Sequence, residues 1–248
     1  MNLELKEENG NINLYVPSNK SLKEIYQLIS KLHQSEINVI KVDRLSLEQM
    51  KLIFVLCKEY GELRGYETEE MRELLQNEFC ESREIEYFSI SPYKKNACSM
   101  ETATEFIQFI IEHSIKYGYN LIIHEGKGLN MKFKSAREVC PDIRRWVLAH
   151  LLNKSCAVCG KQYDIDLHHW DSANTIGGYE HDDGLQTRFI SLCREHHTQF
   201  HNIGAEKFSK LWHLEGVWLS VNLVVELKKV YPNHFKAFKI GNYKREEG

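Results

Sequence analysis

The stretch from Cys156 to His201 carries three of the seven cysteines and six of the twelve histidines of this 248-residue chain. Cys156 and Cys159 are separated by two residues, and Cys193 and His196 repeat that spacing. Two such pairs can surround a tetrahedral zinc ion while ordering little of the chain between them. The pattern predicts one structural zinc site with four ligands: Cys156, Cys159, Cys193 and His196. Its binding energy would stabilise a small, loop-rich module.

The alternative is that these cysteines are buried apolar residues and that His196 is an ordinary surface histidine. The repeated spacing and the polar composition of the segment between the pairs favour zinc. The remaining cysteines fall outside any pair and are predicted to be plain core residues: Cys57, Cys80, Cys98 and Cys140.

Beside the zinc ligands, the same stretch contains two further pairs of histidines. His197 and His201 are one helical turn apart and would share a helix face. His168 and His169 follow residues 164–167, whose alternation is typical of a strand, so their side chains should point to opposite sides. We therefore expect His168, His197 and His201 to bind a catalytic divalent ion and His169 to stay outside it. A second structural zinc site or a set of pH-sensitive surface histidines is the alternative.

A free imidazole such as His169 can act as a general base toward water near neutral pH. A neighbouring divalent ion would stabilise charge on a phosphoryl oxygen and on the departing 3′ oxygen. Together these groups point to hydrolysis of a phosphodiester. Asp166 and Asp171 flank the doublet and could orient an imidazole, although a turn role is favoured for Asp171.

The overall composition limits the kinds of partner and compartment that suit this chain. A formal charge of −3 excludes a polycation, so nucleic-acid contacts must come from local clusters. One basic cluster precedes the metal region, with Trp146 inside it as a predicted core residue: Lys127, Lys132, Lys134, Arg137, Arg144 and Arg145. An odd number of cysteines without a signal peptide indicates a reducing compartment. The short apolar runs predict no membrane span.

Hydrophobic periodicity gives a coarse order of elements. Strands are expected at residues 11–16, 37–42 and 119–124, and helices at 22–32, 46–63, 68–81, 100–117, 141–153, 205–214 and 221–230. Residues 125–134, with two glycines and three lysines, are interpreted as a linker.

The order Cys-x2-Cys, Leu-His-His, Gly-Gly and Leu-Cys-x2-His-His-x3-His over residues 154–203 resembles the HNH, or ββα-metal, endonucleases with an added zinc-binding pair. The resemblance implies that His168 ligates the catalytic ion, which would be Mg²⁺, Mn²⁺, Ni²⁺ or Zn²⁺, beside the structural Zn²⁺. It implies that His169 activates water and that the closing helix supplies His197 and His201.

One position departs from the family pattern. The family asparagine that braces the catalytic loop usually lies five residues before the second cysteine pair, where this chain has Arg188. Asn174 could substitute for it, or Arg188 could hold the loop and contact a phosphate. An ordinary surface arginine is the other interpretation.

Residues 1–125 show no nucleotide loop, catalytic triad or acid pair. Their element order, with RLSLEQ at residues 44–49 and Ser99-Met100, resembles the lambda Orf (NinB) recombination mediators, phage proteins that bind single-stranded DNA as dimers. The whole chain, through SPYKKNACSMETATEFI and GLQTRFISLCREHH, is similar to HNH nucleases of phages and prophages of Gram-positive bacteria. These resemblances imply single-stranded or branched DNA as partner, a homodimer, and the cytoplasm of a bacterial host.

The sequence therefore predicts an α+β protein in which a mixed amino-terminal α/β domain precedes a zinc-stapled ββα-metal nuclease module. The predicted parts are an Orf-like domain at 1–125, a basic linker and helix at 126–153, the nuclease module at 154–203 and carboxy-terminal helices at 204–248. The expected function is metal-dependent DNA cleavage in phage recombination or DNA processing. Two rivals are a non-catalytic recombination mediator with a structural zinc module and a defence-type restriction nuclease.

Overall fold

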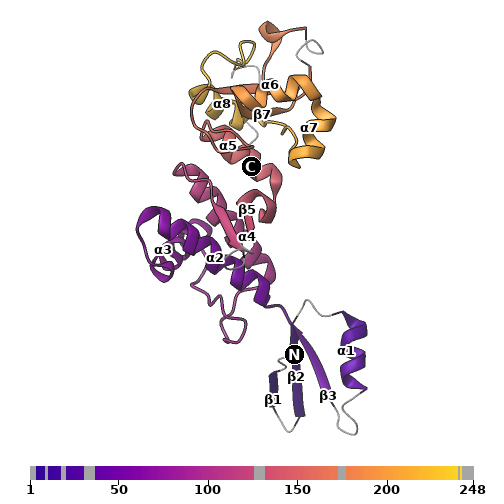
Figure 1. The fold of residues 1–248 in the computed structure, drawn as a ribbon. Helices are drawn as coiled ribbons and strands as arrows, with labels where there is room; N and C mark the ends of the chain where they lie inside the picture. The colour runs from indigo at the N-terminus through magenta and orange to yellow at the C-terminus, as the bar shows by residue number, and fades with distance from the viewer. Residues whose placement is uncertain are drawn as a thin grey trace. The chain divides into compact units, whose positions relative to one another are not determined.

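The computed structural model describes residues 4–8, 11–17, 21–30, 37–125, 132–172, 177–239 and 241. The chain divides into two compact units, Met1–Lys58 with Glu67–Ile107 and Glu59–Tyr66 with Gln108–Gly248. Figure 1 shows the ribbon of the chain, coloured by residue number. Among the described helices, none combines the length and the apolar character that crossing a membrane requires. The domain boundaries predicted from the sequence stay predictions.

The first unit begins with a three-stranded sheet. Strand β1 (Glu4–Glu8) runs antiparallel to β2 (Asn11–Pro17), and β2 runs parallel to β3 (Ile37–Val42). Helix α1 (Leu22–Ile29) lies in the connection between the parallel strands, as a parallel pair requires. The strands predicted at residues 11–16 and 37–42 are confirmed, whereas β1 was not predicted because its sequence, ELKEE, is mostly charged.

Helices α2 (Leu47–Arg64), α3 (Thr68–Arg83) and α4 (Met100–Lys116) follow, within two residues of their predicted ends. Phe79 contacts Phe88 and Phe106 with ring centroids 6.1 and 5.2 Å away, and these rings form the centre of the first unit's core. Helix α3 is closed at its start by a reciprocal capping box between Glu67 and Glu70.

The second unit contains a hairpin of β4 (Ile122–Glu125) and β5 (Lys132–Ser135). Glu125 pairs with Lys132 and Ile123 with Lys134, so the predicted linker is wrong at both ends. Residues 132–135 alternate as a strand does. The two glycines before them favoured a linker, so this short strand was not predicted. Lys127 lies outside the described residues.

A ββα arrangement lies at the centre of the second unit. Strand β6 (Ile165–His169) pairs antiparallel with β7 (Phe189–Cys193), and α6 (Arg194–Ile203) follows β7 directly. In Figure 1, α6 lies beside β7, and α5 (Ile143–Leu152) contacts β7 as well. Helix α7 (Ala205–Trp212) packs on α6, and α8 (Val221–Val230) packs on α5. Short 3-10 helices, η2 (Ala136–Val139) and η4 (Tyr179–His181), complete the unit.

Helix α5 shows why this segment folds as predicted. Asp142 caps its start by accepting hydrogen bonds from the backbone N–H groups of Arg144 and Arg145. Its buried face carries Trp146, whose indole Nε1–H donates to the Ala157 carbonyl at 2.9 Å. Trp146 is therefore a core residue, as predicted, and it ties α5 to the first cysteine turn.

Candidate metal centre and active site

The first cysteine pair lies in a tight turn held by the backbone. The Gly160 N–H donates to the Cys156 carbonyl at 2.8 Å, and the Ala157 N–H donates to the Ser191 carbonyl of β7 at 2.9 Å. Gly160 has a φ of +74°, and a Cβ there would lie 2.7 Å from Cβ of Asn120. Only glycine fits both demands. The turn is thereby fixed beside the strand that ends at Cys193.

The structure brings the two predicted pairs together. The ligand atoms of all four residues lie within 4.8 Å of one another: Cys156, Cys159, Cys193 and His196. Nδ1 of His196 lies 3.1 Å from Sγ of Cys193 and 3.6 Å from Sγ of Cys156. Three thiol sulfurs and one imidazole at these distances form a donor set that suits a closed zinc site. The cluster therefore could bind a metal such as zinc.

The protonation of the cysteines supports that assignment. A hydrogen bond from the Cys156 thiol lowers the pKa of Cys159, whereas the same contact and burial raise the pKa of Cys156. When no cation is bound, the two sulfurs therefore favour one shared negative charge. A bound divalent cation removes that restriction, because it favours deprotonated sulfur at both positions.

The second predicted ligand set also converges. The ligand atoms of His168 on β6 and of His197 and His201 on α6 lie within 4.8 Å of one another. Nε2 of His201 is 2.9 Å from Nε2 of His197. Exposure rises from buried His168 through half-buried His197 to exposed His201. The cluster is therefore open on one side, unlike the cysteine-containing cluster, in which three of the four residues are buried.

His168 has the properties of an unused ligand. Its Nε2 is buried and lacks a hydrogen-bond partner among the described residues. Burial, with the nearby His197 and His201 rings, lowers the pKa of His168 to about 3, so the ring is neutral. A buried imidazole nitrogen without a hydrogen bond is costly unless something binds it. A divalent cation would satisfy this atom, so the residues present fit the metal that the pattern predicts.

Asp166 fixes the orientation of His197. Its Oδ2 lies 2.6 Å from Nδ1 of His197, with both side chains about a quarter exposed. A carboxylate accepts only, so Nδ1 of His197 carries the proton and Nε2 keeps a lone pair on the side of the cluster. The sequence had suggested that one of the flanking aspartates orients an imidazole, and Asp166 has this position.

His169 points away from the three-histidine cluster. Its ring contacts Tyr179 and Phe189, with centroids 5.1 and 4.7 Å away, whereas the His168 ring packs against Phe200 of α6 at 4.3 Å. The strand alternation therefore separates the two neighbours as expected. Nε2 of His169 lies 3.0 Å from Oδ2 of Asp182, a residue that sequence reasoning missed. The two residues are thirteen positions apart in the sequence, a spacing that matches no helix or strand period.

Arg188, the residue predicted to replace the loop-bracing asparagine, binds Asp171. Its Nε and Nη2 donate to the Asp171 carboxylate at 3.1 and 2.7 Å, and its backbone N–H donates to the same group at 3.1 Å. These bonds lower the pKa of Asp171. The pair closes the base of the β6–β7 loop, so Asp171 is more than the turn residue that the sequence favoured. Asn174 lies outside the described residues.

Arg188→Ala should destabilise the second unit. Charge-assisted hydrogen bonds contribute about 1.5–3 kcal/mol when buried, and partial exposure of both side chains reduces this to about 1–2 kcal/mol. Calorimetry of the zinc-loaded protein should show a melting temperature about 2–8 °C lower. Lys236→Ala, which removes an exposed pair with Glu180, is the control and should change it far less. Equal shifts for both variants would contradict a bracing role.

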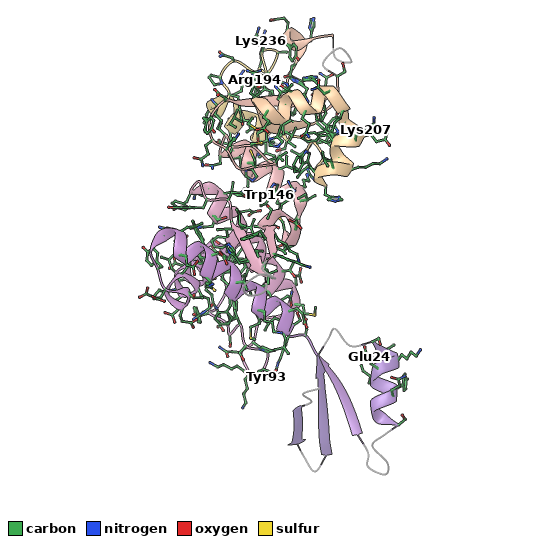
Figure 2. All side chains as sticks on the ribbon, viewed as in Figure 1. Glu24, Tyr93, Trp146, Arg194, Lys207 and Lys236 are labelled. Atoms are coloured by element: carbon green, nitrogen blue, oxygen red, sulfur yellow. The ribbon has the colours of Figure 1, made fainter. Side chains whose placement is uncertain are left out.

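The predicted basic cluster is not uniformly exposed. Arg145 makes a bidentate pair with Glu112 at 2.6 and 2.8 Å, and Arg137 is half-buried over the Trp212 ring. Arg144 and Lys132 are exposed, and Lys134 is half-buried. Figure 2 labels three further cations of the second unit, all exposed: Arg194, Lys207 and Lys236.

The comparisons agree with this geometry. A family model described as "Putative HNHc nuclease" matches residues 19–231, most of the chain. No match was found among curated proteins or among solved structures. The matched range includes both metal clusters, the His169–Asp182 pair and the ββα arrangement. The chain therefore belongs to this family of HNH nucleases.

Proposed function

We propose that this protein is a metal-dependent endonuclease that hydrolyses DNA phosphodiester bonds. The proposal is supported chiefly by the separate positions of the histidines. His168, His197 and His201 converge on one side of β6, and His169 is held apart on the other. The four-ligand cluster joins Cys193 and His196 of the ββα arrangement to the turn that carries Cys156 and Cys159, and three of its four residues are buried, so it suits a structural ion.

The chemistry assigned to each residue follows from these positions. His168, His197 and His201 would hold a divalent cation, which when bound offsets negative charge on the phosphoryl and leaving oxygens. The Asp182 contact at Nε2 leaves Nδ1 of His169 as the nitrogen that takes a proton from water. The water oxygen then bonds to phosphorus, the bond to the 3′ oxygen breaks, and the leaving oxygen takes a proton from solvent. The products are a 5′ phosphate and a 3′ hydroxyl.

His201→Ala should separate the two metal sites. His201 is exposed, so its removal should not disturb the core, but it removes one of three ligands. Isothermal titration calorimetry should show Mn²⁺ affinity reduced by more than about tenfold. Elemental analysis should still find one zinc per chain. Unchanged Mn²⁺ affinity, or loss of the zinc, would contradict the assignment of two separate sites.

The proposed substrate is DNA that is not simple duplex. We infer that the enzyme acts on single-stranded or branched DNA, because the first 125 residues resemble recombination mediators that bind such DNA. Purified protein should be incubated with supercoiled plasmid, single strands and branched duplexes in Mg²⁺, Mn²⁺ or Ni²⁺. Cleavage of branched or single-stranded DNA with 5′ phosphate ends is expected. Tight binding of single strands without cleavage in any metal would instead support a non-catalytic mediator.

A further inference from the structure

Asp182 forms a buried pair with His169. The two side chains are only 3 % and 5 % exposed, and Nε2 of His169 lies 3.0 Å from Oδ2 of Asp182. A buried carboxylate needs a partner that offsets the loss of water. His169 provides that partner, although neither residue belongs to the two metal clusters. The pair therefore has to be explained separately from metal binding.

The fold holds the Asp182 carboxylate in a fixed position. Its Oδ1 accepts a hydrogen bond from the Gly184 N–H at 2.8 Å, and its backbone carbonyl accepts one from Ala237 at 3.0 Å. Gly184 has a φ of +83°, and a Cβ there would lie 2.7 Å from the Phe235 ring. Only glycine allows this close packing of the loop. One carboxylate oxygen is thus committed to the backbone and the other faces His169.

This arrangement selects one tautomer of His169. An ionised carboxylate accepts hydrogen bonds and donates none, so Nε2 of His169 must carry the proton and Nδ1 must carry the lone pair. Resting on the proposed function, we propose that Asp182 is a positioning residue for DNA hydrolysis. It fixes the Nε2–H tautomer and the ring orientation, and it stabilises the imidazolium that forms when Nδ1 takes the proton from water. The proton from water moves onto Nδ1 of His169 and not onto Asp182, and it passes to solvent after the bond to the 3′ oxygen has broken.

Asp182→Asn tests this role because a backbone N–H group fixes the orientation of the new amide. The Gly184 N–H requires an acceptor, so the new carbonyl oxygen takes the place of Oδ1 and the NH₂ group faces His169. That group donates to Nε2, which forces the proton to Nδ1 and removes the base. We expect kcat for DNA cleavage to fall by on the order of 10²-fold or more, with KM changed by less than about threefold. Asp183→Asn is the control and should cleave normally.

A double-mutant cycle distinguishes positioning from general support of the fold. In a His169→Ala background, Asp182→Asn should change the residual rate by less than about twofold, because the group through which it acts is gone. A purely structural role would lower the rate in both backgrounds. Equal losses in both backgrounds would therefore overturn the proposal.

A readout independent of cleavage completes the test. Nitrogen NMR of ¹⁵N-histidine-labelled, zinc-loaded protein should show His169 as the Nε2–H tautomer and as the Nδ1–H tautomer in Asp182→Asn. An Nδ1–H tautomer in the wild type, or no change in the variant, would overturn the positioning role. A wild type with the expected tautomer that cleaves no DNA would instead overturn the proposed function. The two failures are therefore distinguishable.

Discussion

His169→Ala should lower the rate of DNA cleavage by on the order of 10²–10⁴-fold. The imidazole lies apart from the three converging histidines, and the Asp182 contact at Nε2 leaves Nδ1 as the proposed proton acceptor. Alanine removes the group that accepts the proton while leaving every proposed metal ligand in place. Relaxation of supercoiled plasmid in Mg²⁺ or Mn²⁺, followed over time on agarose gels, measures the loss.

The control for this prediction is His181→Ala. His181 is an exposed histidine of the same loop that belongs to neither ligand cluster. Its replacement should leave the cleavage rate within about twofold of the wild type. The His169→Ala protein should keep its zinc content, its melting temperature within a few degrees and its affinity for DNA in gel-shift assays. Undiminished cleavage by a folded His169→Ala protein would show that another group activates water.

Cys156→Ser should unfold the zinc-containing part of the chain. Cys156 is fully buried, and its turn is tied to β7 through the Ala157 N–H. Structural zinc contributes an apparent binding free energy of about 10–16 kcal/mol in zinc-finger peptides at neutral pH. The whole stability of a typical domain is about 5–15 kcal/mol. Calorimetry should show that the transition of this unit is lost or shifted far below that of the wild type.

Cys140→Ser is the matched variant, because Cys140 lies in the same unit but outside the cluster. It should retain one zinc per chain and lose little stability. Removal of zinc from the wild type by a strong chelator should reproduce the Cys156→Ser melting curve. A Cys156→Ser protein that melts like the wild type would remove the structural role assigned to the zinc cluster.

The parts of the site that could be predicted from the sequence are those whose geometry is local. Two residues between ligands define each half of the zinc cluster, and one helical turn places His197 beside His201. Strand alternation separates His168 from His169, because neighbouring residues on a strand face opposite sides. The long helices were predicted to within two or three residues for the same reason, since each carries a repeated apolar face.

The parts that could not be predicted depend on contacts between distant residues. Asp182 is thirteen positions from His169 in the sequence, and Arg188 is seventeen positions from Asp171. Neither spacing corresponds to a helix or strand period. The hairpin strand β5 was missed because its identity depends on pairing with β4 and not on its own four residues. The same limit applies to the basic cluster, in which Arg145 binds Glu112 of a different helix.

We propose that the histidines and cysteines divide into a closed zinc site and an open catalytic site, with His169 outside both. Anomalous diffraction from crystals soaked in Mn²⁺ tests this division. We expect a zinc peak among Cys156, Cys159, Cys193 and His196. A manganese peak should lie within about 2.0–2.3 Å of nitrogens of His168, His197 and His201. The result that contradicts the account is a single peak per chain, or a second peak that includes His169 among its ligands.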